Sequence, residues 1–255
     1  MRKAVLLLAT MALAVFAAGG VAQAIINGQP DGNRHPYVGL VTDEEFVCSG
    51  AAISPRVFIT AAHCFEEPGQ EVFVTFDPDG FYGEKESVFH TGTWYPDPEF
   101  CIGCAGGLVG FDTHDVAVVI LDEPVSLERY ASLPTRGLVD RLANKTRATA
   151  VGYGIQDREK DLDEGELFTR YRARVELIQS NNRISDEFLK VTANPSQGKG
   201  GTCFGDSGGP ILRGDTILGV NSFVTNGNCA GVTYAYRIDT VEALAFINSV
   251  IEEHA

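Results

Sequence analysis

The glycine-rich stretch at residues 205–210 (Gly-Asp-Ser-Gly-Gly-Pro) constrains the fold of this chain more than any other segment. Its glycines permit a tight turn, and the apolar pair Ile211-Leu212 that follows is typical of a buried strand. A serine on such a turn, next to an acid, is typical of a nucleophile whose substrate carbonyl meets backbone N–H groups. Serine is a weak nucleophile at its own pKa, so this interpretation requires a histidine base and a group that orients the histidine.

Two upstream segments supply the candidates. His63 lies in the sequence Thr-Ala-Ala-His-Cys at 60–64, and Asp115 directly precedes an entirely apolar run from Val116 to Leu121. Asp112 and Asp122 are the competitors for the acid, but neither is followed by such a run. With Ser207, these motifs resemble the trypsin/chymotrypsin family of secreted serine proteases, and the resemblance spans nearly all of 25–255.

The resemblance implies an all-β fold of two six-stranded antiparallel β-barrels with a C-terminal helix. It implies a catalytic triad in which Ser207 attacks, His63 transfers the proton and Asp115 holds the histidine. It also implies an oxyanion hole from the backbone N–H groups of Gly205 and Ser207, and it requires no metal or organic cofactor. The exposed stretch 123–145 is the expected crossover between the barrels.

The first 24 residues are typical of a cleaved secretory signal. Arg2 and Lys3 precede an apolar run at 4–18, and the small-x-small sequence Ala-Gln-Ala ends the segment at 22–24. A membrane anchor is the alternative, but the run is short for a span of about 20 residues. We therefore expect an exported protein, extracellular or periplasmic, whose mature domain covers 25–255.

The formal net charge of −14 limits the partners. The acidity argues against nucleic acid or an anionic membrane surface as a partner. The family resemblance implies protein or peptide substrates, protein inhibitors as further partners, and a monomer. Several acids gather in loops between 65 and 100, where solvated loops are favoured over the alternative, a calcium site, because the spacing fits no calcium motif.

All six cysteines lie beyond residue 24, and an even number in an exported chain predicts disulfides, with 15 possible pairings. The resemblance implies the pairs Cys48–Cys64 and Cys203–Cys229, which leaves Cys101 and Cys104 as a local loop staple. The Cys-x-x-Cys spacing also fits a redox-active pair or half of a metal site, although no second ligand pair is evident.

Residues 25–28 (Ile-Ile-Asn-Gly) directly follow the predicted signal. In the family, a new N-terminus of the Ile-Val-Gly-Gly kind folds inward, and its ammonium pairs with the acid before the catalytic serine. The resemblance therefore implies an activating ion pair between Ile25 and Asp206, although Asn27 departs from the usual glycine. Our hypothesis is that signal removal itself creates this terminus.

The substrate pocket is also inferred by resemblance. Trypsin-like members that select Arg or Lys carry an aspartate six residues before the serine, where this chain has Gly201. Val224 replaces a glycine at the mouth and narrows it, so we expect cleavage after small to medium apolar residues rather than after Arg or Lys. The expected pocket residues are Gly201, Thr202, Phe204, Ser222, Phe223, Val224 and Gly231.

The helix and strands are predicted from periodicity and caps. Residues 239–254 predict a helix with a capping box of Asp239 and Glu242, which we expect to pack on the second barrel. Val241, Leu244, Ile247 and Ile251 share its expected apolar face. Alternating or β-rich runs predict strands at 37–41, 47–53, 56–60, 72–76, 88–90, 148–154 and 171–178.

Two rival functions remain. The Gly-x-Ser-x-Gly spacing also fits the nucleophile elbow of α/β-hydrolases, but those enzymes place the acid and the histidine after the serine. Here the only later histidine is His254, next to the last residue, so this alternative fails. The second rival is a catalytically silent binding protein on a protease fold, although such proteins usually lose a triad member.

Overall fold

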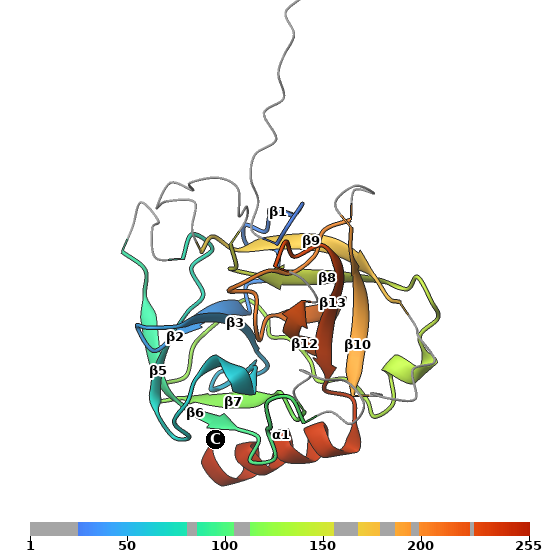
Figure 1. Cartoon of the computed structure of the whole chain (residues 1–255). Helices are drawn as coiled ribbons and strands as arrows, with labels where there is room; N and C mark the ends of the chain where they lie inside the picture. Colours follow the sequence, from blue (N-terminus) through green and yellow to red (C-terminus); the bar gives the residue numbers. More distant parts are fainter. Residues whose placement is uncertain are drawn as a thin grey trace, which may run out of the picture.

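The computed structural model describes residues 25–80, 86–104, 113–155, 168–178, 187–194, 199–224 and 227–255 (Figure 1). The predicted signal at 1–24 lies outside the described residues, as does the acidic stretch 156–166. Within the described parts, no helix is long and apolar enough to cross a membrane.

The first half of the chain forms a closed antiparallel barrel. Its strands are hydrogen-bonded in the order β2-β3-β4-β7-β6-β5, so the last strand pairs back onto the first. Large apolar side chains such as Phe58, Leu40 and Trp94 fill the interior and are almost fully buried. The strands are β2 (Val38–Thr42), β3 (Val47–Ala52), β4 (Val57–Thr60), β5 (Glu71–Thr75), β6 (Phe89–Pro96) and β7 (Ala117–Leu121).

The second half forms a curled seven-stranded sheet in the order β1-β9-β8-β11-β12-β13-β10. An isolated bridge between Leu177 and Val191 joins the end of β9 to β10, so the six strands of this half curve back on themselves. The seventh strand, β1, comes from the N-terminal part of the described chain. The strands are β1 (Gln29–Pro30), β8 (Arg147–Gly152), β9 (Tyr171–Glu176), β10 (Phe188–Ala193), β11 (Pro210–Arg213), β12 (Thr216–Val224) and β13 (Gly231–Arg237).

This architecture confirms the predicted all-β class with two barrel-like halves and a terminal helix. The predicted strands of the first barrel occur, and β6 extends well beyond the predicted 88–90 because Gly92 to Pro96 pair with β7. The segment between β7 and β8 contacts both halves. Val125 N–H donates to the Pro55 carbonyl (2.8 Å), and Ser132 N–H donates to the Asp215 carbonyl (2.9 Å).

The C-terminal helix α1 (Val241–His254) differs from the prediction in its cap and in its packing. Thr240 is the N-cap and accepts from the Ala243 N–H, because the Asp239 carboxylate is committed to the Val139 N–H and to Arg237. Of the predicted apolar face, Ile247 is buried and Ile251 packs against the core, but Val241 is exposed. The helix also buries Ala243 and Val250. It packs against β7 of the first barrel, beside which it lies in Figure 1, rather than on the second barrel as predicted.

Candidate active site

The pairing of β4 with β7 explains why His63 and Asp115 meet. The strands are antiparallel, with Thr60 opposite Ala117, so the end of β4 lies beside the start of β7. His63 follows β4 in a short 3-10 helix, η1 (Ala62–Cys64), and Asp115 stands two residues before β7. Residues 52 positions apart in sequence are thereby brought into contact.

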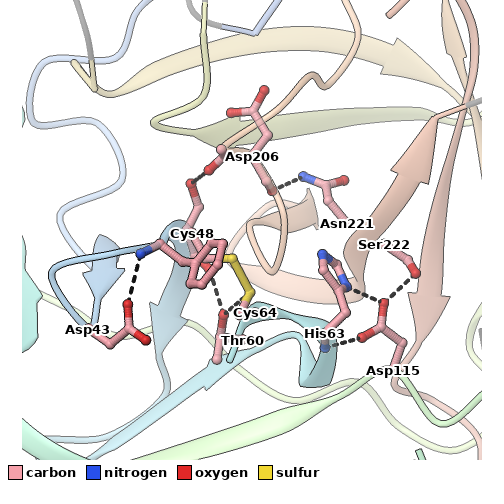
Figure 2. Close-up of a disulfide and its surroundings, with 12 residues drawn as sticks. Asp43, Cys48, Thr60, His63, Cys64, Asp115, Asp206, Asn221 and Ser222 are labelled. Atoms are coloured by element: carbon pink, nitrogen blue, oxygen red, sulfur yellow. Dashed lines mark hydrogen bonds and ion pairs between the residues drawn. A yellow bond between two sulfur atoms is a disulfide. The ribbon is translucent and has the colours of Figure 1, made fainter. Parts of the chain in front are cut away.

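Asp115 is fully buried and accepts three hydrogen bonds. Its Oδ1 accepts from the backbone N–H of His63 (3.0 Å), and its Oδ2 interacts with Nδ1 of the same residue (2.8 Å). The Ser222 hydroxyl, from β12, also donates to Oδ2, as Figure 2 shows. Burial alone would raise the pKa of the Asp115 carboxyl, but the charge and hydrogen bonds of His63, together with Ser222, outweigh burial and lower it. The arrangement fixes the orientation of the imidazole.

Ser207 lies on the loop before β11, and glycines allow that loop to press against the first barrel. Gly208 has a φ of +75°, and a Cβ there would stand 2.1 Å from Oγ1 of Thr60. Gly205 has a φ of +90° and closely approaches Gly154. Only glycine can adopt a positive φ and approach neighbouring atoms this closely without strain. Within the described residues, the N–H groups of Gly205 and Ser207 donate no hydrogen bond, so both are available to a substrate oxygen.

Ser49 links the two halves at this loop, a role that sequence reasoning missed. It is fully buried on β3 of the first barrel. Its hydroxyl donates to the carbonyl of Gly205 (2.9 Å) and accepts from the N–H of Tyr153 (2.9 Å). Its backbone N–H donates to the carbonyl of Ser207 (2.8 Å). The run 47–53 predicted this strand, but a serine whose side-chain partners lie more than a hundred residues away leaves no local signal.

A cavity of about 590 Å³ adjoins these residues. His63 and Ser207 both line it, so the candidate base and nucleophile face one space. Five of the seven predicted pocket residues line it too. Cys203, Asn221 and Gly227 also line it and were not predicted to do so. The described lining is His63, Thr202, Cys203, Phe204, Ser207, Asn221, Ser222, Phe223, Val224 and Gly227.

Gly201 and Gly231, the other two predicted pocket residues, are not part of this lining. Gly201 is buried against β10, where an added Cβ would stand 2.2 Å from the Cβ of Ala193. Gly231 opens β13, where it is exposed and pairs with Ala193. The assignment of both residues to the substrate pocket therefore stays a prediction. An added side chain at Gly201 would require β10 to shift, which explains the glycine at this position.

Asp206 is a second fully buried carboxylate, one residue before Ser207. Its oxygens accept from the N–H groups of Gly154 (2.9 Å) and Cys203 (2.8 Å). Burial raises its pKa to about 7, against the effect of these two hydrogen bonds. Among the described residues, no basic group pairs with it.

Ile25 is fully buried, and the carbonyl of Ile26 accepts from the N–H of Gly201 (3.1 Å). The start of the described chain thus lies against the serine-bearing segment. In the full chain the nitrogen of Ile25 is an amide, so it carries no charge. The structure brings this residue to the second sheet without pairing it to Asp206, and the predicted ion pair requires a chain that begins at Ile25.

The disulfides are Cys48–Cys64, Cys101–Cys104 and Cys203–Cys229, the pairs that we expected. The first fixes η1 to β3, and the third joins the serine loop to the segment before β13. Among the described residues, the one group of three potential metal ligands is Cys48, His63 and Cys64. Both sulfurs of that group are in a disulfide, so they are not thiolate ligands.

A buried Asp–His pair beside a serine turn, shared between two β-barrel halves, defines a chymotrypsin-like protein. Comparison with known proteins agrees. The sequence model of the family described as Trypsin matches residues 25–247. The chain therefore belongs to the trypsin family.

Several relatives in this family are proteases by name. The chain is 27% identical to the cercarial protease of Schistosoma mansoni, with 85% of each chain covered. It is 27% identical to brachyurin of Leptuca pugilator, over 83% of this chain and 88% of that one. A solved structure named human heparin binding protein shares the fold with a TM-score of 0.66 and 20% identity, covering 91% of this chain and 98% of that chain.

Proposed function

We propose that this chain is a secreted serine endopeptidase that acts through an acyl-enzyme. The observation that carries the proposal is the contact of the His63 ring with the buried Asp115, beside a cavity that Ser207 also lines. Ser207 attacks the peptide carbonyl while His63 accepts its proton. His63 then donates that proton to the leaving amine, and water hydrolyses the acyl-enzyme by the same route.

Asp115 stays ionised throughout this cycle. Its hydrogen bond to Nδ1 selects the imidazole tautomer in which Nε2 carries no proton and accepts the one from serine, and its charge stabilises the imidazolium. Ser222 supports Asp115 from the second sheet. The N–H groups of Gly205 and Ser207 stabilise the oxyanion, and each donor in such a site contributes about 3 kcal/mol to the barrier reduction.

The proposed specificity is for small to medium apolar side chains rather than Arg or Lys. The described lining of the cavity contains no carboxylate to compensate a buried cation, and Val224 is part of that lining. By resemblance to the family, a valine at this position narrows the mouth. Protein or peptide substrates follow from this chemistry. We also propose a cleaved signal at 1–24, export, a protease domain at 25–255 and activation by pairing of the Ile25 ammonium with Asp206.

Fold alone does not establish catalysis, since a relative of this fold is named for binding. The test is cleavage of a peptide library varied at the acyl-side residue, by protein that begins at Ile25 and by its Ser207→Ala variant. We expect cleavage that the variant lacks. Absence of cleavage by both folded proteins would overturn the proposal in favour of a binding protein. Cleavage after Arg or Lys would retain the protease and overturn the specificity.

A further inference from the structure

Asn221 is a buried amide in the wall of the candidate substrate cavity. It lies on β12 directly before Ser222, is 2% exposed, and lines the same space as His63 and Ser207. Its backbone N–H donates to the Gly209 carbonyl (2.8 Å), and its carbonyl accepts from Gly208 (2.7 Å). The backbone is therefore satisfied, and only the side chain has capacity for a ligand.

The orientation of this amide is set by the carbonyl of Asp206. The Nδ2 group of Asn221 donates to that carbonyl oxygen (3.2 Å), as Figure 2 shows. Reversing the amide would place two acceptor oxygens against each other, so the donor end must face Asp206. Within the described residues, the remaining atom, Oδ1, is buried and has no hydrogen-bond partner. A buried acceptor in this state is destabilising, and a donor that reaches it is favoured.

Thr202 adds a second acceptor to the lining. Its hydroxyl donates to Oγ1 of Thr233 (3.0 Å), so its proton is used and its lone pairs remain. Apart from His63, no side chain in the described lining is ionisable. The wall therefore offers acceptor oxygens without a negative charge. That combination suits an uncharged hydrogen-bond donor and disfavours an ammonium or a guanidinium.

We propose that Asn221 is a specificity-determining residue that selects, at the substrate position occupying this cavity, an uncharged hydroxyl or carboxamide side chain. The inference rests on the proposed function and changes one part of its specificity. The exclusion of Arg and Lys is kept, but among side chains of matched size the uncharged donor-bearing one replaces the purely apolar one as the preferred residue. In the complex with substrate, an apolar side chain leaves the Asn221 Oδ1 without a hydrogen-bond donor, whereas a donor-bearing side chain supplies one.

The test uses three pairs of near-isosteric peptide substrates that differ only at the acyl-side residue: Thr against Val, Asn against Leu, and Gln against Met. The chain that begins at Ile25 is assayed with each. We expect kcat/KM to favour the donor-bearing member of at least one pair by about 10-fold or more. If no pair favours its donor-bearing member by more than about 3-fold, the inference is overturned.

The variant Asn221→Val removes the acceptor, and Asn33→Val is the matched control because Asn33 is exposed. We expect Asn221→Val to abolish the preference for the donor and Asn33→Val to keep it. Titration with a serine-reactive phosphonate counts the folded active sites of each variant, and the wild-type ratios decide the matter if Asn221→Val does not fold. A preference that persists in folded Asn221→Val overturns the assignment to Asn221. Loss of all cleavage by wild type, with Ser207→Ala indistinguishable from it, is instead a failure of the proposed function.

Discussion

Asp115 and Asp206 are both fully buried carboxylates beside the candidate nucleophile, but their surroundings differ. Asp115 receives the His63 ring, the His63 backbone N–H and the Ser222 hydroxyl, and its pKa is lowered. Asp206 receives two backbone N–H groups, and burial raises its pKa to about 7. A buried carboxylate is stable as an anion only with sufficient compensation. The pair of Asp115 and His63 is therefore complete in the full chain, whereas Asp206 has no cation beside it among the described residues.

The largest expected effect comes from Asp115, the carboxylate that is already compensated by its hydrogen bonds and by His63. Asp115→Asn keeps the shape of the side chain but replaces an acceptor with an amide, so His63 is held in the wrong tautomer. We expect kcat to fall about 10⁴-fold near neutral pH, as in other triads of this type. Steady-state hydrolysis of an activated peptide, corrected for titrated active sites, measures the loss.

The matched control for that variant is Asp239→Asn. Asp239 is equally buried but holds Arg237 and the Val139 N–H, away from the cavity. We expect this control to lower the melting temperature and to leave kcat per folded molecule unchanged. A loss of similar size in both variants would mean that Asp115 acts only through stability.

The second prediction concerns Asp206, the carboxylate that has no cation beside it among the described residues. In a chain that begins at Ile25, Asp206→Asn removes the partner of the new ammonium, so the loop that carries the Gly205 N–H loses its support. We expect kcat/KM to fall about 10²- to 10³-fold, the cost of losing an oxyanion donor. Adding one alanine before Ile25 should have the same effect without touching Asp206. Full activity of the alanine-extended protein would rule out activation by the terminus.

The third prediction is a difference in pH dependence. Because the pKa of Asp206 is raised in the folded chain, the folded state binds more protons than the unfolded state between about pH 4 and 7. Stability contributed by this group is therefore lost as the pH rises, by up to about 1.4 kcal/mol per pH unit. Asp115 has the opposite sign, since its lowered pKa contributes stability that is lost in acid.

Chemical denaturation between pH 5 and 8 measures this slope, in a Ser207→Ala background that prevents self-digestion. We expect the free energy of unfolding to fall with rising pH in the chain that retains residues before Ile25. Asp206→Asn should remove this fall, and so should starting the chain at Ile25, where the ammonium keeps the carboxylate paired. Identical slopes in all three proteins would contradict the contrast between the two carboxylates.

The sequence predicted the parts of this molecule that local motifs encode. The barrel strands and the segments that carry His63, Asp115 and Ser207 are visible as short patterns, and the disulfide pairs followed from the family resemblance that these motifs carry. Contacts between distant segments were not predictable. The helix α1 packs on the first barrel rather than the second, and Gly201 packs closely against Ala193. The role of Ser222 toward Asp115 likewise depends on neighbours that only the fold supplies, and so does the Asn221 oxygen that has no partner among the described residues.

Ser49 provides the smallest and most specific test, because it supports the serine loop from the first barrel as Asp206 supports it from the second sheet. Ser49→Ala leaves the carbonyl of Gly205 and the N–H of Tyr153 without their shared partner. We expect a loss of stability of about 1–3 kcal/mol and a fall in kcat of about 10-fold, with KM unchanged, because the oxyanion donor shifts while the substrate pocket remains. Ser132→Ala, at an exposed serine that bonds to Thr216, is the control and should change neither quantity by much. If Ser49→Ala loses stability but keeps kcat, Ser49 only joins the two halves, and the geometry of the serine loop depends on Asp206 alone.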